Sequence, residues 1–138
     1  MKLNLSDEER AESLDWCRDF LDHHCIFRTP DGESMLTSPN GGLHTWQFYT
    51  QTATLDQEFS LRMAKLFWDH FNDGYTANPF QICGCESGGV PMLGPLQRIA
   101  FAGGLAINVF SIKKEPKKYG LKNWIEGLGL ALSSRRDS

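Results

Sequence analysis

A helical pattern of apolar residues opens the chain. Apolar positions three or four residues apart form one face of the first segment: Leu14, Cys17, Phe20 and Leu21. Ser6 and Glu9 have the spacing of a capping box, in which a hydroxyl and a carboxylate satisfy the first free amides of a helix. The pattern therefore predicts a helix from Ser6 to about His23.

The next part of the chain alternates between short apolar runs and polar stretches. Residues 25–27 predict a short strand, 28–42 a polar loop, and 44–49 a second strand because its apolar positions alternate. Thr54 is then a suitable N-cap for a second amphipathic helix that ends at a stop signal in 72–74.

The second half of the chain has the pattern of a βαβ unit. An apolar run at 80–83 predicts a strand, 84–89 a glycine-rich turn, and the segment up to Gly103 a helix. A further run at 105–112 is rich in strand-forming residues and ends in a lysine-rich segment at 113–120. Strand, helix and strand in this order predict an α/β fold with a parallel sheet and a right-handed crossover.

The two loops that follow these strands are the candidate ligand site. The carboxyl ends of parallel strands meet at one edge of a sheet, so residues 84–89 and 113–120 should lie together. The backbone amides of Glu86, Ser87, Gly88 and Gly89 can form an anion-binding nest if the glycines adopt positive φ, and the following helix would add its positive end. The alternatives are a plain strand-to-helix turn and an exposed basic hairpin.

Composition narrows the class of protein. A chain of 138 residues predicts one domain, which we place at 1–132 with a polar tail at 133–138. A net charge of −3 argues against nonspecific nucleic-acid binding. The sequence has no apolar run long enough to span a bilayer and no apolar core of a signal peptide near Met1. We therefore expect a cytoplasmic protein.

Four cysteines raise the question of disulfides or a metal. The spacings of Cys17, Cys25, Cys83 and Cys85 fit no common zinc pattern, and a domain of this size does not need disulfides. We interpret all four as free thiols, with one of Cys83 and Cys85 buried and the other in the loop, and we expect no metal held by the chain alone.

The two loops carry a family resemblance. A small-residue loop after one strand, followed by Lys-Lys-Glu-Pro-Lys-Lys-Tyr-Gly at 113–120 after the next, resembles the type I phosphoribosyltransferases, most of all orotate phosphoribosyltransferase. That family has Arg-Lys-Glu-x-Lys-x-His-Gly at this place, so Lys113 and Tyr119 are departures. Residues 124–127 lie where the family's next strand begins. The family's base-binding Lys-Ser-Gly element has no counterpart, because Asn40-Gly41-Gly42 occupies that turn.

The resemblance implies a function and a set of site residues. It implies transfer of ribose 5-phosphate from phosphoribosyl pyrophosphate (PRPP) to a nucleobase in pyrimidine nucleotide synthesis, with Mg²⁺ bound together with PRPP. It implies a homodimer in which the mobile loop completes the neighbour's site. Lys117 would be the catalytic residue, and the pyrophosphate or PRPP would be bound by Glu86, Ser87, Gly88, Gly89, Lys113, Lys114, Lys117 and Tyr119.

One family signature is missing. These enzymes bind the ribose phosphate through an acidic pair and a threonine-glycine turn, one strand after the lysine loop, whereas residues 128–138 contain neither. We therefore expect a fold that is incomplete at its C-terminus and little transferase activity from this chain alone. The alternative function is a catalytically silent homologue that binds a phosphate, a nucleotide or a protein partner.

Overall fold

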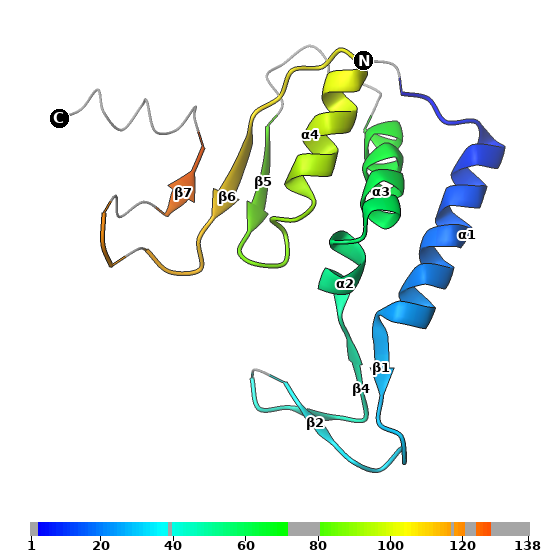
Figure 1. Ribbon diagram of the computed structural model, residues 1–138, viewed down its shortest axis with the longest axis vertical. Coiled ribbons are helices and arrows are strands. Elements are labelled where there is room, and N and C mark those ends of the chain that lie inside the picture. Colours follow the sequence, from blue (N-terminus) through cyan, green and yellow to red (C-terminus); the bar gives the residue numbers. More distant parts are fainter. Residues whose placement is uncertain (1–2, 39, 72–80, 117, 121–123, 128–138) are drawn as a thin grey trace.

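The computed structural model describes residues 3–38, 40–71, 81–116, 118–120 and 124–127 (Figure 1). Its elements in chain order are α1 (Asp7–His24), β1 (Ile26–Arg28), β2 (Leu36–Thr37), β3 (Leu43–His44), β4 (Trp46–Phe48), α2 (Thr50–Thr54), α3 (Gln57–His70), β5 (Ile82–Cys85), α4 (Leu93–Ala102), β6 (Val109–Ile112) and β7 (Ile125–Glu126). The α/β class predicted from the sequence is confirmed. None of the described helices is long and apolar enough to cross a membrane.

Helix α1 begins as the sequence predicts. The Ser6 hydroxyl accepts from the amide of Glu9 at 3.1 Å, and the Glu9 carboxylate accepts from the amide of Ser6 at 2.8 Å. This reciprocal pair satisfies two of the free amides at the helix start. On the predicted apolar face Cys17 is buried, whereas Leu14 is exposed, so the buried stripe is narrower than the pattern indicated.

The prediction that Thr54 caps the second helix is wrong. Residues Thr50–Thr54 form a separate short helix, α2, which ends as the amide of Leu55 bonds to the carbonyl of Gln51 at 3.1 Å. Helix α3 starts afterwards with Asp56 as its N-cap, whose carboxylate accepts from the amide of Phe59 at 2.8 Å. The predicted stop at 72–74 lies outside the described residues.

Two small antiparallel pairs occupy the first half of the chain. Strands β1 and β4 pair from Ile26 opposite Phe48 to Arg28 opposite Trp46. The predicted loop at 28–42 contains β2, which pairs with β3, so the loop is partly a hairpin. The predicted strand at 44–49 is divided between β3 and β4, and its large side chains Trp46, Phe48 and Tyr49 are all exposed.

The predicted βαβ unit is present in the second half. Strands β5 and β6 are parallel, with Cys83 opposite Phe110, and α4 joins them. The first strand is Ile82–Cys85 and not 80–83, because Gly84 and Cys85 continue its pairing; Phe80 lies outside the described residues. Strand β7 pairs antiparallel with β6, so the sheet is mixed and has the order β5-β6-β7.

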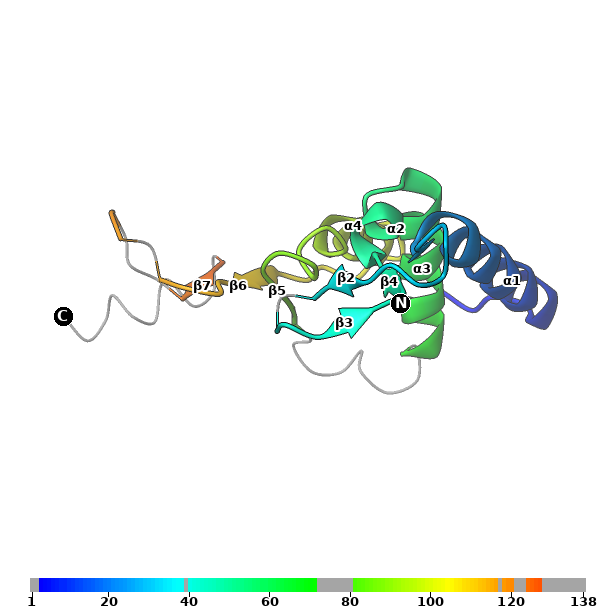
Figure 2. The same ribbon diagram turned by 90° about the horizontal axis from the view of Figure 1, so that it is seen from below.

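The core lies where α3 and α4 meet. Ala64 and Trp68 of α3 pack with Leu96, Ile99 and Ala100 of α4. Figure 2 shows α4 next to β5, with α3 and α1 following beyond the β5 edge of the sheet, and α3 packs between α4 and α1. A second cluster joins α1 to the start of α3 through Cys17, Cys25, Ala53 and Phe59. In this fold α4 therefore packs on the small sheet, and α3 and α1 continue the helical layer beyond it.

The prediction of free thiols is confirmed, but the predicted difference between Cys83 and Cys85 is wrong. Both are exposed, whereas Cys17 and Cys25 are buried. Alternate residues of a strand point to opposite faces, so Gly84 faces α4 while both cysteines lie on the far face. Burial raises the pKa of the Cys17 and Cys25 thiols.

An ion pair ties the start of α1 to the end of α3, and we expect it to make stability depend on pH. The Asp69 side chain is only 7% exposed and accepts from Arg10 Nε at 2.7 Å and from the amide of Leu5 at 2.9 Å. The Arg10 hydrogen bonds, with that of Leu5, lower the pKa of Asp69 from its ordinary value of 3.8. A depressed pKa stabilises the fold above that ordinary value, and this stabilisation is lost as the pH falls through the depressed pKa.

The test is urea unfolding of Asp69→Asn and the unchanged protein from about pH 7 to about pH 2. The unchanged protein should be more stable by a constant amount at neutral pH, and the difference should shrink below the ordinary pKa of the carboxyl. Arg10→Met removes the cause of the shift and should flatten the same part of the profile. A difference that is independent of pH would contradict this role for the pair.

Candidate functional site

The structure brings the two predicted loops to one edge of the sheet. Cys85, the last residue of β5, lies opposite Ile112, the last residue of β6. The amide of Glu86 then donates to the carbonyl of Ile112 at 2.8 Å, so the two chains are still joined where the loops begin. In Figure 1 both loops leave the sheet at its lower end. The predicted meeting of the loops is confirmed.

The glycines of the first loop serve close packing of the backbone. A Cβ on Gly84 would lie 2.6 Å from the carbonyl oxygen of Gly89, and one on Gly89 would lie 2.9 Å from the amide nitrogen of Cys85. Real side chains do not approach backbone atoms so closely, so the turn needs glycine at both positions. Neither Gly88 nor Gly89 has a positive φ, which corrects the predicted reason for their presence.

Hydrogen bonds within the loop decide which amides can reach a ligand. The amide of Glu86 is taken by Ile112, and the amide of Gly89 donates to the carbonyl of Cys85 at 2.9 Å. Among the described residues no hydrogen-bond partner is found for the amides of Ser87 and Gly88. Helix α4 begins only at Leu93, so its positive end is several residues from the loop. The predicted nest is thus reduced to two amides and the Ser87 hydroxyl.

The lysine segment splits into a buried and an exposed part. Lys113 follows β6, its side chain is 4% exposed, and its ammonium pairs with the Glu126 carboxylate of β7. The amide of Lys113 also donates to the carbonyl of Trp124 at 2.8 Å. Lys114, Lys118 and Tyr119 are exposed. Lys117 lies outside the described residues.

The pairing of Lys113 is a feature that the sequence pattern did not indicate. The sequence predicted Lys113 as an anion ligand held at the strand end. The position is indeed held, but the ammonium is committed to a carboxylate on the neighbouring strand. The cations that remain for a ligand in the described part of the loop are those of Lys114 and Lys118.

Gln51 contacts the glycine loop, which the sequence pattern did not indicate. Its side-chain amide donates to the Ser87 hydroxyl at 3.0 Å, across a separation of 36 residues. The bond brings α2, and with it the end of the β1–β4 pair, to the glycine loop. No hydrophobic periodicity or motif in the sequence marks Gln51.

Among the described residues no cluster of metal ligands is found at this edge. The described residues contain no group of three or more histidine, cysteine, aspartate or glutamate side chains that could hold an ion. Glu86 is exposed and is the carboxylate that the first loop itself supplies.

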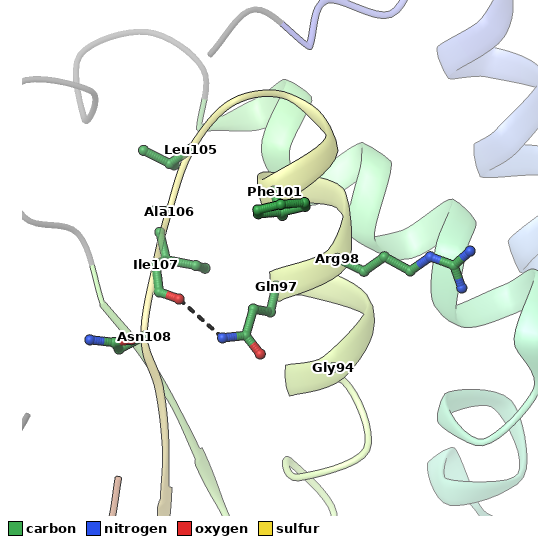
Figure 3. Close-up of a pocket in the computed structure, with 8 residues that line it drawn as sticks. All are labelled: Gly94, Gln97, Arg98, Phe101, Leu105, Ala106, Ile107 and Asn108. Atoms are coloured by element: carbon green, nitrogen blue, oxygen red, sulfur yellow. Dashed lines mark hydrogen bonds between the residues drawn. The ribbon is translucent and has the colours of Figure 1, made fainter. Parts of the chain in front are cut away.

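Several surface hollows that the described residues form lie away from the two loops. One of about 480 Å³ lies between α4 and the segment before β6, at the opposite end of that strand from Lys113. Figure 3 shows Gln97 of α4 pointing to the carbonyl of Ile107, to which it donates at 3.1 Å, while Arg98 extends away from residues 105–108. Arg98 is the charged residue that lines this hollow, so among the described residues the candidate site rests on the two loops.

Solved structures with a similar fold are phosphoribosyltransferases. Orotate phosphoribosyltransferase of Mycobacterium tuberculosis matches with a TM-score of 0.61 and 20% identity, over 87% of this chain and 60% of that one. A phosphoribosyltransferase of Corynebacterium diphtheriae matches with a TM-score of 0.59 and 18% identity, over 87% and 58% of the two chains. The chain therefore has the α/β fold of the type I phosphoribosyltransferases.

Curated relatives show which phosphoribosyltransferases the sequence resembles. Orotate phosphoribosyltransferase of Bradyrhizobium diazoefficiens is 33% identical over 113 residues, which cover 80% of this chain and 59% of the relative. The enzyme of the same name from Bradyrhizobium sp. strain ORS 278 is 31% identical over 104 residues, which cover 75% and 54% of the two chains. No protein-family model matches the sequence. Within its class the chain resembles orotate phosphoribosyltransferase, as the sequence predicted, and it spans less than two thirds of these relatives' length.

Proposed function

We propose that this chain binds the pyrophosphate group of PRPP between its two loops and takes part in transfer of ribose 5-phosphate to a nucleobase, a step of pyrimidine nucleotide synthesis. The hydrogen bond from Glu86 to Ile112 is the observation that carries the proposal, because it holds both loops at one sheet edge. In open α/β sheets ligands bind at the carboxyl ends of the strands. The M. tuberculosis enzyme with the similar fold has been solved in complex with PRPP.

The residues at this edge suit a leaving pyrophosphate. In the transfer, the bond from ribose C1 to the pyrophosphate oxygen breaks, a base nitrogen forms the new bond to C1, and that nitrogen loses its proton. Negative charge grows on the leaving group as its bond breaks. The amides of Ser87 and Gly88 and the ammonium groups of Lys114 and Lys117 would stabilise this charge, which lowers the barrier if they bind the transition state more tightly than the substrate.

Mg²⁺ would enter the site with PRPP. This ion keeps waters and phosphate oxygens as ligands and needs only one or two protein carboxylates. The exposed carboxylate of Glu86 fits that need, and the described residues offer no larger cluster. The cation would neutralise part of the pyrophosphate charge and orient the leaving group.

The proposal also covers the oligomeric state of the protein and its location in the cell. Within the described residues β5 pairs with β6 alone, so its other edge is open to another strand. We propose a homodimer in which the segment around Lys117 reaches the neighbour's site. Closure of this segment would exclude water from the reaction. A cytoplasmic location suits an enzyme of nucleotide synthesis.

The alternative is a silent homologue that binds a phosphate compound or a protein partner without transfer. The Lys113–Glu126 pair favours it, because one of the loop's cations is used inside the protein. Both functions share the anion site, and only the first predicts turnover. Loss of orotate absorbance in the presence of PRPP and Mg²⁺ distinguishes them.

Pyrophosphate binding tests the shared site. We expect added pyrophosphate to shift the amide NMR signals of Ser87 and Gly88, whose N–H groups face no protein acceptor in the described residues. Lys114→Ala and Lys117→Ala should each weaken binding about tenfold, because each removes a charge-assisted contact. Lys65→Ala, on the exposed side of α3, is the matched control and should leave the affinity unchanged. Equal affinities in all three variants would refute the site.

A further inference from the structure

One peptide group links the glycine loop to the strand that follows the lysine segment. The carbonyl of Ile112 accepts from the amide of Glu86 at 2.8 Å. The amide of Lys113 belongs to the same peptide bond and donates to the carbonyl of Trp124 at 2.8 Å. Hydrogen bonds in such a chain polarise and strengthen one another. The glycine loop is therefore held on one side of this peptide, and the residue before β7 on the other.

The side chain of Lys113 adds a second contact to β7. Its ammonium pairs with the carboxylate of Glu126, and the Lys113 side chain is 4% exposed whereas that of Glu126 is 46% exposed. A lysine is rarely buried to this degree without a partner, because an ammonium without a counter-charge is costly to remove from water. The backbone and the side chain of one residue thus both bind the segment of β7.

Strand β7 depends on such contacts because it is short. It consists of Ile125 and Glu126, which pair with the last two residues of β6. Ile125 and the preceding Trp124 are exposed, so their side chains bury little apolar surface. A pairing of two residues is weak by itself. The Lys113–Glu126 pair therefore matters for keeping β7 in register with β6.

The enclosed position of the Lys113 ammonium argues against direct contact with a ligand. The Nζ atom itself is buried. A pyrophosphate could reach it only after displacing the Glu126 carboxylate. The neighbouring Lys114 is exposed and needs no such displacement.

We propose that Lys113 and Glu126 are positioning residues of the anion site. Their pair fixes the peptide between Ile112 and Lys113, and this peptide sets how the glycine loop lies relative to Lys114. The inference rests on the proposed function, which it deepens by giving Lys113 a role other than that of an anion ligand. The competing roles are a ligand whose access Glu126 blocks, and a contact that serves stability alone.

Glu126→Leu tests the pair from the side of the carboxylate. The variant leaves the Lys113 ammonium buried without its counter-charge, so the ammonium must turn to water and release its hold on β7. We expect the affinity for pyrophosphate, measured by calorimetric titration, to fall about fivefold. The loss should be smaller than that of Lys114→Ala, because all the cations that bind the anion are still present.

The double variant separates positioning from binding. Lys113→Met combined with Glu126→Leu replaces the pair with apolar side chains, a change that often preserves the packing of a buried ion pair. We expect the affinity to return to within about twofold of that of the unchanged protein. A ligand role predicts the reverse, namely tighter binding by Glu126→Leu and weaker binding by the double variant. Glu115→Leu removes an exposed negative charge from the lysine segment without touching β7, and as the control it should not weaken binding.

Hydrogen exchange of the free protein gives a readout that needs no ligand. Relative to the amides of α3, those of Glu86 and Lys113 should exchange about tenfold faster in Glu126→Leu and recover in the double variant. The Glu86 amide is the more informative of the two, because it lies on the side of the peptide away from Glu126. Urea unfolding checks that each variant is folded during the titrations.

Each result supports or overturns the inference. Pyrophosphate binding by Glu126→Leu that is tighter or unchanged overturns it, and so does a double variant that binds as weakly as the single one. A loss with Glu115→Leu equal to that with Glu126→Leu also overturns it. If the unchanged protein binds no pyrophosphate, the proposed function is overturned, whereas the expected changes in exchange would still show that the pair positions the glycine loop.

Discussion

Trp68→Ala is expected to lower the free energy of unfolding by about 3–5 kcal/mol, the usual cost of removing a large buried side chain. Trp68 is 2% exposed and lies between α3 and α4 in the main cluster of buried residues. Its indole N–H donates to the carbonyl of Leu96 at 2.8 Å. Alanine would leave a cavity between α3 and α4. This contact positions α4, and α4 in turn positions the glycine loop.

Urea unfolding measures the loss in free energy of unfolding. The helix signal in circular dichroism at about 222 nm follows the transition. Phe101→Ala is the matched control, because this aromatic side chain on α4 is 78% exposed and should cost less than about 0.5 kcal/mol. Trp68→Phe should fall between the two, since it keeps most of the ring volume and loses the N–H group. Equal stability of Trp68→Ala and Phe101→Ala would mean that the two helices do not pack as described.

Gly84→Ala is expected to disrupt the glycine loop and abolish pyrophosphate binding. Its Cβ would lie 2.6 Å from the carbonyl oxygen and 2.8 Å from the carbonyl carbon of Gly89, and backbone atoms cannot rotate away as a flexible side chain can. The loop must then shift as a whole, which displaces the amides of Ser87 and Gly88. Overpacking of this kind costs about 1–3 kcal/mol of stability.

Gly88→Ala provides the comparison within the same loop. A Cβ on Gly88 meets no atom within 4 Å, and its φ is not positive, so alanine is accommodated without strain. We expect its stability to stay within about 0.5 kcal/mol of the unchanged protein. Calorimetric titration with pyrophosphate and urea unfolding report on both variants. If Gly88→Ala proves as damaging as Gly84→Ala, close backbone packing is not what the loop requires.

Features that depend on local chemistry could be predicted from the amino-acid sequence alone. The capping box at Ser6 and Glu9 begins α1 because hydroxyl and carboxylate lie within one helical turn of the free amides. The two apolar runs around α4 predict parallel strands, since a helix between them returns the chain to the same end of the sheet. From that topology follows the meeting of the glycine and lysine loops, and the motif at 113–120 indicates the family.

The partners of the candidate site residues depend on how the elements pack, which the sequence pattern does not reveal. Lys113 and Glu126 are distant along the chain, and their pairing exists because β7 returns alongside β6. Gln51 reaches Ser87 because the fold places α2 beside the glycine loop, a contact that hydrophobic periodicity does not mark. The glycines at 84 and 89 are required by backbone packing across the turn, not by positive φ. Local patterns encode which elements form, whereas contacts between elements far apart in sequence depend on how those elements pack.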